Sequence, residues 1–276
     1  MTRFHVVVPT RVPERSALPG FVTDVRPPER GPEHRLTARA AELGGLDGAF
    51  VPFDPDGHDS LILAPALLRD SHHLQVTAEF HPGTATPVYA AKLSASLQRY
   101  AAGRLAWRLV VDLPPAVARA HGDYLEGPAR YARADEFLTI AKGVWNQRGY
   151  SREGEYFQVK DGGLLPSRVP SPFPRVYLSG TSPEALDLSA RHADAHLLDP
   201  DGDVSLVPDG VDAALRLSFH LASEDDDLKL ARAIARRREE GVSEFFLDPA
   251  DPVADTYRLA QRVLPLVEKE GAGHVR

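Results

Sequence analysis

Short apolar runs alternate along this chain with longer segments in which apolar and polar positions follow a helical spacing. A buried parallel strand is a nearly continuous apolar run of about four to eight residues, rich in β-branched and aromatic side chains. Eight such runs occur, and each predicts a β-strand. The predicted strands cover residues 4–9, 48–53, 74–80, 105–111, 176–178, 195–198, 215–222 and 244–247.

The segments between these runs predict helices, because their apolar residues recur with helical periodicity and their ends carry capping residues. Gly44 and Gly45, for example, close the first predicted helix as a left-handed stop. Residues 151–173 break the alternation, and their Gly and Pro residues predict a short hairpin followed by a loop. The predicted helices cover residues 32–43, 59–69, 87–100, 127–145, 183–191, 225–240 and 252–268.

Alternation of strands and helices along the chain predicts one domain, a single (β/α)8 TIM barrel spanning residues 1–276. A doubly wound open sheet is the competing fold, but it does not normally need eight strands in a chain of this length. The chain also lacks the G-x-G-x-x-G and G-x-x-x-x-G-K-[ST] motifs that bind nucleotide phosphates. We therefore expect a closed barrel whose eighth strand contains Phe245 and Phe246.

The formal net charge of -7 argues against a nucleic-acid partner, because phosphate contacts need clustered Lys and Arg side chains. The basic run 236–238 is followed at once by Glu239 and Glu240, which indicates a solvated helix end. The chain has no cysteine, which excludes disulfides, thiolate metal ligands and cysteine nucleophiles. Without a secretory signal or a long apolar stretch, we expect a cytoplasmic protein with no membrane partner.

Two pairs of neighbouring residues, His58-Asp59 and His72-His73, carry side chains that can bind metal ions. Neither pair has convergent carboxylates at a recognisable ligand spacing. The acidic residues at 54, 56 and 59 also lack the distal Glu of a calcium loop. No metal site is therefore predicted.

Residues 173–186, FPRVYLSGTSPEAL, combine a predicted strand with a small loop and the start of a helix. Ser182 has the position of an N-cap, and Pro183 has that of the first helical residue. A strand, a loop of small residues and a helix N-terminus form the usual geometry for holding a phosphate. The same pattern is also typical of a well-capped turn, and both interpretations stay open on these residues alone.

Two side chains near the predicted C-terminal ends of strands are candidate catalytic residues. His81 follows the third strand and Arg216 lies in the seventh, and the C-terminal rim of a barrel carries the catalytic groups. The alternatives are a rim histidine without a role and an arginine in a structural salt bridge.

Several segments along the chain carry a resemblance to a known family. They are FHVVVPT (4–10), RLTARAAELGGLDGAFVP (35–52), HPGTATPVYAAKLSASLQRYAAGRLAWRLVV (81–111), ARYARADEFLTIAKGVW (129–145), YFQVKDGGLLP (156–166) and PRVYLSGTSPEALDLSARHADAHLL (174–198). In this order they resemble the bacterial luciferase-like monooxygenases, and among them most the alkanesulfonate monooxygenase branch. No single segment is decisive, but together they follow the family order over most of the chain.

This resemblance implies FMN bound at the top of the barrel, used in its reduced form with O₂ and supplied by a separate flavin reductase. It implies that the phosphate is held by Tyr131 and by the loop Ser179, Gly180, Thr181 and Ser182. The implied function is an FMN-dependent oxidoreductase, either a monooxygenase or a related oxidase or dehydrogenase, acting on an organic substrate that a carrier protein could present. The alternative is a non-catalytic or partner-dependent flavoprotein that retains the barrel and the phosphate site.

The chain departs from the family pattern near the implied site. Residues 109–115, LVVDLPP, replace an Asn-x-x-Thr-Gly stretch, which removes polar contacts to the flavin ring and a flexible glycine turn. Residues 56–59, DGHD, stand where the branch often has a cysteine. In the seventh strand Arg216 is retained, but Ser218 replaces the histidine that usually accompanies it.

The largest departure is a deletion between the seventh and eighth strands, where the branch normally inserts a long segment that supplies a lid. Here one predicted helix, residues 225–240, spans the gap. Since a lid excludes water from reactive groups, the deletion implies that another protein covers the mouth of the barrel. A homodimer is the first candidate, because two-fold dimers are the commonest soluble assemblies, and a substrate-carrying protein is the second.

Overall fold

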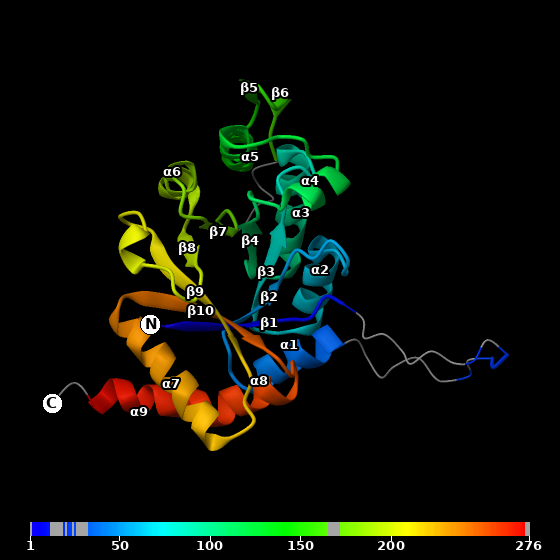
Figure 1. Cartoon of the computed structure of the whole chain (residues 1–276). Helices are drawn as coiled ribbons and strands as arrows, with labels where there is room; N and C mark the ends of the chain where they lie inside the picture. The colour runs from blue at the N-terminus through cyan, green and yellow to red at the C-terminus, as the bar shows by residue number, and fades with distance from the viewer. Residues whose placement is uncertain are drawn as a thin grey trace.

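The computed structural model describes residues 2–11, 19, 21–23, 25, 33–164 and 172–273. Within these ranges, eight parallel strands close into a barrel in the order β1-β10-β9-β8-β7-β4-β3-β2 (Figure 1). The closed order confirms the predicted (β/α)8 barrel and excludes the open sheet. The barrel strands are β1 (Arg3–Val7), β2 (Gly48–Val51), β3 (Gln75–Phe80), β4 (Leu105–Leu109), β7 (Arg175–Ser179), β8 (Ala195–Leu198), β9 (Asp212–Phe219) and β10 (Val242–Pro249).

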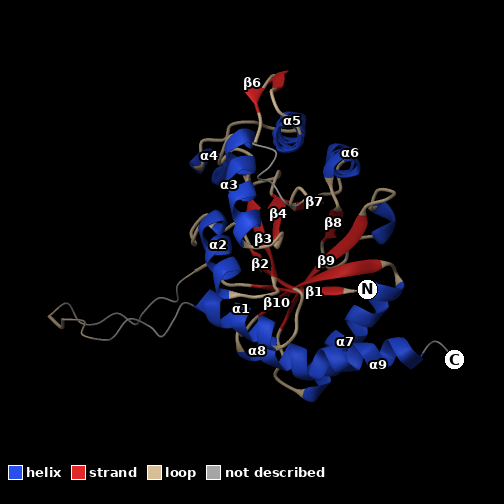
Figure 2. Ribbon diagram, turned by 180° about the vertical axis from the view of Figure 1, so that it is seen from behind, coloured by secondary structure: helices blue, strands red, loops and turns tan. Residues whose placement is uncertain are grey.

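Helices surround these strands, and one two-stranded hairpin stands apart from the barrel (Figure 2). The predicted helix start at Pro32 and the predicted loop at 165–171 lie outside the described residues. The elements are α1 (Glu33–Leu43), α2 (Ser60–Asp70), α3 (Pro87–Tyr100), α4 (Pro115–Ala120), α5 (Pro128–Asn146), the hairpin β5 (Tyr150–Glu153) and β6 (Gln158–Gly162), α6 (Pro183–His192), the short turn η2 (Val204–Leu206), α7 (Glu224–Glu239), α8 (Ala254–Arg258), the π-helical η3 (Leu259–Val263) and α9 (Leu264–Gly273).

Two differences from the sequence prediction have local causes. The prediction missed α4, because two successive prolines resemble a loop, yet Pro115 is the first helical residue, where no N–H is needed. Strand β9 begins at Asp212, whereas the sequence predicted a start at Leu215. The prediction missed the first residues because the alanines there do not resemble an apolar strand run. Ala214 is fully buried inside the barrel, where a small side chain leaves room for larger neighbours.

An apolar layer fills the middle of the barrel. Phe246 lies within it, with its ring centroid 5.1 Å from that of Phe50 and 5.1 Å from that of Tyr177. The neighbouring Phe245 points to the opposite face of the strand and stacks on Phe4 at 5.7 Å. The prediction that the eighth barrel strand, β10, contains both phenylalanines is confirmed. The apolar layer consists of Val7, Phe50, Ala106, Tyr177, Ala195, Leu197, Ala214 and Phe246.

A buried charged cluster lies beside this layer, toward the N-terminal ends of the strands. Glu244 is fully buried and accepts hydrogen bonds of 2.6 Å from Tyr177 Oη and from Arg175 Nη2. It also pairs with Arg3 and lies 3.4 Å from His5 Nε2. Burial would raise the pKa of Glu244, but the nearby His5, the hydrogen bond from Tyr177 and the charge of Arg175 lower it to about 2. This end of a barrel usually serves stability.

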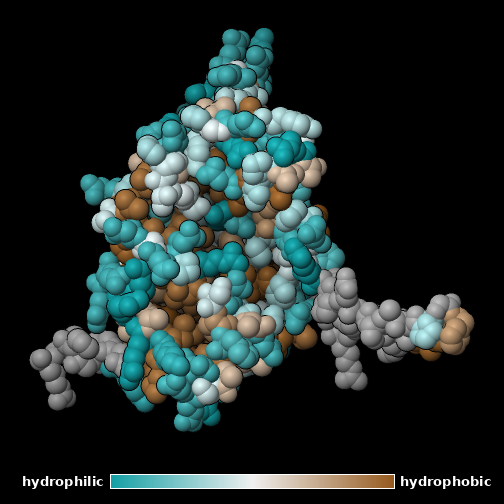
Figure 3. All heavy atoms as spheres, in the orientation of Figure 1, coloured by the Kyte–Doolittle hydropathy of each residue, from teal (hydrophilic) through white to brown (hydrophobic). Residues whose placement is uncertain are grey.

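The β5–β6 hairpin projects at the top of Figure 1, and hydrophilic side chains cover it (Figure 3). Glu136 on α5 holds its turn, because its carboxylate accepts hydrogen bonds from the backbone N–H groups of Tyr156 at 3.1 Å and Phe157 at 2.7 Å. A Cβ on Gly154 would stand 1.9 Å from Glu136 Oε1, so any side chain there would displace the Glu136 carboxylate. Glu136 therefore fixes the turn to α5 through the main chain, while Tyr150, Phe157 and Val159 add apolar packing.

A short turn and one helix, α7, connect β9 to β10, and this connection is described in full. The Ser223 hydroxyl accepts from the Asp226 N–H at 3.3 Å, and the Asp226 carboxylate accepts from the Ser223 N–H at 2.9 Å. This capping box starts α7 immediately after the turn. The structure confirms the predicted shortening, because residues 220–241 contain no inserted segment beyond this helix.

Candidate active site

A cavity of about 260 Å³ opens at the C-terminal ends of β3, β4, β7, β8 and β9. Barrel enzymes place their active sites at this face, where loops from several strands meet. The side chains around it are mostly polar, although apolar residues from the ends of β4 and β8 complete the wall. Residues lining the cavity include Arg108, Asp112, Ser179, Thr181, His196 and Arg216.

The predicted phosphate loop forms one side of this cavity. Ser179 ends β7, and Gly180 follows with a φ of 113°, a backbone conformation that favours glycine. A Cβ on Gly180 would stand 2.8 Å from Ala185 Cβ, so the loop approaches α6 closely. The Ser182 hydroxyl accepts from the Ala185 N–H at 3.2 Å and caps α6. The capped turn predicted from the sequence is therefore present, and the helix N-terminus that it starts lies beside the cavity.

Tyr131, in the first turn of α5, reaches this loop from the other side. Its side chain is 8% exposed, and its hydroxyl lies 3.6 Å from the position that a Gly180 Cβ would take. The hydroxyl donates to Asp112 Oδ2. Burial and the hydrogen bond to Asp112 raise the pKa of Tyr131 to about 12, so the phenol stays protonated. The structure thus brings together Tyr131 and the predicted loop, which are far apart in the sequence.

Arg108 and Glu79 form a charged floor that the sequence reasoning missed. Arg108 Nη1 lies 2.7 Å from Glu79 Oε1, and Nη2 donates to Ser179 Oγ at 2.6 Å. Its Nε atom is buried and has no hydrogen-bond partner among the described residues. A signal for this residue was present, because Arg108 is the one charged position in the apolar run 105–111. Its neighbour Ala106, two residues earlier, faces the barrel interior, which places Arg108 on the same face.

Arg216 on β9 also lines the cavity. Its Nη2 lies 2.6 Å from Asp248 Oδ2, and its guanidinium carbon stands 5.8 Å from the centre of the Phe50 ring. The side chain is 38% exposed, so the ion pair leaves part of the guanidinium open to the cavity. Both sequence interpretations of Arg216, a salt bridge and a contact to a bound molecule, are compatible with this position. A catalytic role for Arg216 stays a prediction.

His81 lies away from the other candidates. It is 2% exposed and does not line the cavity. The Gly83 N–H donates to its Nδ1 at 3.1 Å, and its Nε2 lies 3.1 Å from Asp123 Oδ2. Burial and the charge of Arg133, which pairs with Asp123 at 2.7 Å, lower the pKa of His81 to about 4. The imidazole is neutral near pH 7, and its Nε2 lies 3.1 Å from Arg133 Nη2 as well as from Asp123. A catalytic role for His81 stays a prediction that this position does not favour.

His196 on β8 is a second residue that the sequence reasoning missed. Its Nδ1 lies 2.9 Å from Ser189 Oγ on α6, and the residue is 1% exposed while still bordering the cavity. Burial and the charge of Arg108 lower the pKa of His196, so it adds a neutral polar group to the wall.

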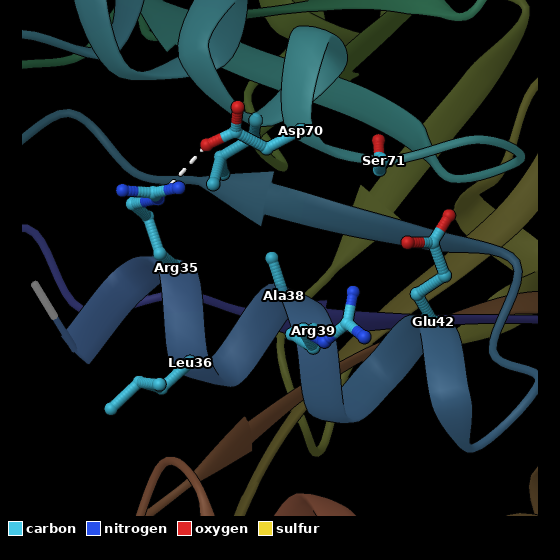
Figure 4. A pocket seen from close by; sticks show the side chains of 8 residues that line it. Arg35, Leu36, Ala38, Arg39, Glu42, Asp70 and Ser71 are labelled. Atoms are coloured by element: carbon cyan, nitrogen blue, oxygen red, sulfur yellow. Dashed lines mark ion pairs between the residues drawn. The ribbon is translucent and has the colours of Figure 1, made fainter. Parts of the chain in front are cut away.

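Another cavity lies between α1 and α2, outside the barrel (Figure 4). Its polar lining consists of Arg35, Arg39, Glu42, Asp70 and Ser71, and Arg35 forms an ion pair of 2.9 Å with Asp70. Helix α1 and the end of α2 supply this lining, whereas barrel enzymes carry their catalytic groups at the C-terminal ends of the strands. We therefore assign the candidate active site to the C-terminal mouth of the barrel.

Two further observations concern the described part of the chain only. No three His, Asp or Glu side chains there converge in a way that could hold a metal ion. The acidic loop residue Asp54 instead accepts a hydrogen bond of 2.6 Å from Arg11. None of the helices in the same ranges is both long and apolar enough to cross a bilayer.

A match over most of the chain shows the family to which it belongs. The model of the luciferase-like monooxygenase family matches residues 2–241. Because this match covers most of the 276 residues, the chain belongs to the luciferase-like monooxygenase family. The resemblance carried by the sequence segments is thereby confirmed.

Individual relatives add detail. The chain is 33% identical over 169 residues to an FMNH2-dependent dimethylsulfone monooxygenase from Pseudomonas putida. This match covers 58% of the chain and 47% of the relative, so the chain spans about half the length of that protein. A riboflavin lyase structure with modified FMN and riboflavin superposes with a TM-score of 0.76 at 16% identity, covering 98% of this chain and 92% of that one. EDTA monooxygenase from Chelativorans sp. BNC1 superposes with a TM-score of 0.71 at 17% identity, covering 86% of each chain. These structures share the barrel fold.

Proposed function

We propose that this protein is an FMN-dependent oxidoreductase, and in the first place a monooxygenase that uses reduced FMN and O₂. The observation that carries the proposal is the convergence of Tyr131 with the loop 179–182 at the mouth of a barrel of this family. The name of the Pseudomonas putida relative, an FMNH2-dependent monooxygenase, supports the same cofactor.

The residues at this loop fit a phosphate group. Gly180 leaves a cradle that a Cβ would fill, and three hydroxyl side chains, Tyr131, Thr181 and Ser182, lie around it. The N-terminus of α6 adds the positive end of its dipole. Hydroxyl and amide donors bind a phosphate dianion through charge-assisted hydrogen bonds, which are stronger than neutral ones.

The protein's part is to bind, orient and shield the flavin, while bound FMN supplies the redox and oxygen chemistry. Arg108 and Arg216 place two guanidinium groups at the cavity, each balanced by one carboxylate. These ion pairs hold the side chains in place with little net charge. The unpartnered Nε of Arg108 can donate to an acceptor on the ring or on a substrate.

The substrate that we propose is an organic molecule that enters this open mouth, either free or presented by a carrier protein. The Pseudomonas putida relative is named for dimethylsulfone, so a small organosulfur compound is the first substrate to test. The shortened connection between β9 and β10 supports a partner that covers the mouth. A homodimer and a separate flavin reductase belong to the same proposal, and so does a cytoplasmic location.

A second candidate function is a non-catalytic or partner-dependent flavoprotein. The observation that favours it is the altered loop after β4, where Asp112 and two prolines stand near the proposed flavin site. The two candidates differ in one measurement, which is product formation by flavin-loaded protein supplied with reductant, O₂ and a range of organosulfur substrates. Flavin binding without turnover on any of them favours the second candidate.

The proposed site is tested by titrating FMN fluorescence against the wild type, Tyr131→Phe and Thr181→Ala. A hydrogen bond to a charged group contributes about 1.5–3 kcal/mol, so each variant is expected to bind FMN roughly ten- to a hundredfold more weakly. Tyr100→Phe is the matched control, because Tyr100 on α3 is 91% exposed and far from the cavity in the fold. Equal affinities in all four proteins would remove this site from consideration.

A further inference from the structure

We infer that Asp112 competes with the flavin phosphate for the Tyr131 hydroxyl. Asp112 therefore weakens the binding of FMN relative to that of riboflavin, which has no phosphate. The inference rests on the proposed flavin site and concerns its specificity. It assigns Asp112 the role of a specificity-determining residue at the phosphate end of the cavity.

The first step is the position of the carboxylate. Asp112 follows the end of β4 and lines the cavity together with Gly180 and Thr181. Its Oδ2 accepts the hydrogen bond that the Tyr131 hydroxyl donates. The proposed phosphate donor is therefore already engaged by an anion that belongs to the protein.

The second step is the rigidity of the loop that carries Asp112. Arg130, the neighbour of Tyr131 on α5, donates from Nη1 to the Leu113 carbonyl at 3.2 Å and from Nε to the Leu125 carbonyl at 2.6 Å. Pro114 and Pro115 follow and restrict the backbone further. These contacts keep the backbone beside Asp112 next to Tyr131.

The third step is the charge of the carboxylate. Asp112 makes no ion pair within the described ranges, whereas the cavity carboxylate Glu79 is paired with Arg108. A phosphate dianion at Tyr131 would therefore stand beside an unneutralised negative charge, which opposes its binding. Riboflavin ends in a ribityl hydroxyl, which can donate a hydrogen bond to the same carboxylate. Asp112 thus opposes the phosphorylated flavin and accepts the unphosphorylated one.

The experiment compares the dissociation constants of FMN and riboflavin by fluorescence titration at a pH well above about 6, where the phosphate is a dianion. The variants are Asp112→Asn, which keeps an oxygen acceptor and removes the charge, and Asp112→Ser. The matched control is Asp199→Asn, because Asp199 is an exposed carboxylate that lines the same cavity. Thermal unfolding of each protein shows that it is folded.

We expect both Asp112 variants to bind FMN on the order of tenfold more tightly than the wild type, and riboflavin no more tightly than the wild type does. Asp199→Asn is expected to change FMN affinity less than Asp112→Asn does. An unchanged FMN-to-riboflavin ratio in both Asp112 variants, or an equal gain in Asp199→Asn, overturns the inference while the proposed flavin site stands. Wild-type protein that binds neither flavin overturns the proposed function and this inference together.

Discussion

Glu79 on β3 and Arg108 on β4 lie directly opposite each other in the strand register and form an ion pair of 2.7 Å at the floor of the cavity. Both side chains are largely buried, at 8% and 12% exposure. Glu79 also accepts from the Phe53 N–H at 2.7 Å, which ties the loop after β2 to the same floor. The pair therefore joins three neighbouring strands at the level of the candidate site.

Removing one partner of this pair is expected to lower the free energy of unfolding, because it leaves the other charge buried and uncompensated. We expect Glu79→Gln to lower the free energy of unfolding by about 3 kcal/mol, and the double variant with Arg108→Met to recover part of the loss. Urea denaturation measures both, with the exposed Glu239→Gln as control. A loss in Glu79→Gln no larger than in the control would show that the pair does not stabilise the barrel.

The buried Glu244 predicts a loss of stability in acid. Its pKa is lowered from 4.5 to about 2 in the folded protein, so the unfolded chain binds the proton more readily. The stabilisation is present above about pH 4.5 and is lost as the pH falls toward 2. It amounts to about 3 kcal/mol, given 1.36 kcal/mol for each pKa unit. Chemical denaturation between pH 6 and 2 should show this slope in the wild type and a smaller one in Glu244→Gln, and identical slopes would contradict the assignment.

Gly180 is expected to tolerate no side chain, for two separate reasons. Its φ of 113° is strained for alanine, and the added Cβ would meet Ala185 at 2.8 Å. The control is Gly45→Ala, where φ is 75° but no atom lies within 4 Å of the new Cβ. We expect Gly45→Ala to cost about 1 kcal/mol and Gly180→Ala clearly more, together with at least about tenfold weaker FMN binding. Similar unfolding midpoints and unchanged FMN affinity would argue against a tight loop.

His81 is expected to remain neutral over the physiological range. Burial and the charge of Arg133 lower its pKa from 6.5 to about 4, so its ring should take up a proton only in acid. A folded-state pKa below the unfolded value contributes stability above about pH 6.5 that is lost as the pH falls toward 4. An NMR titration of the histidine rings tests this, and a His81 resonance that titrates above pH 6 would be incompatible with the structure.

When nothing covers the mouth of the barrel, we expect O₂ to oxidise reduced flavin without oxygenating a substrate. Reduced flavin needs shelter from water, and the connection through α7 supplies no lid. We expect isolated protein supplied with reduced FMN to convert most of the O₂ consumed to H₂O₂, and a covering partner or self-association to lower that fraction. Mass in solution and peroxide yield are measured together. A strict monomer that oxygenates a free small molecule with little peroxide would disprove the need for a cover.

The barrel itself could be predicted from the sequence, because strand and helix periods alternate and each strand forms from its own apolar run. The loop 179–182 could be placed for the same reason, since Ser182 and Pro183 are local signals for a helix start. The contact between Tyr131 and Asp112 could not be predicted, because it joins the first turn of α5 to the loop after β4, and their distance depends on how α5 packs on the barrel. Arg108 was missed because an apolar run predicts a strand without saying which of its residues faces the cavity.

The backbone anchoring of the β5–β6 hairpin gives the protein a convenient reporter position. Glu136 binds main-chain N–H groups, which every residue except proline carries, so an exposed neighbour such as Glu155 can be exchanged without breaking the anchor. The chain contains no cysteine, and Glu155→Cys would therefore introduce a unique thiol for a fluorescent or spin label. A label there would lie on the hairpin that follows α5, the helix that carries Tyr131. Its signal would report the binding of a second molecule on the α5 side of the barrel.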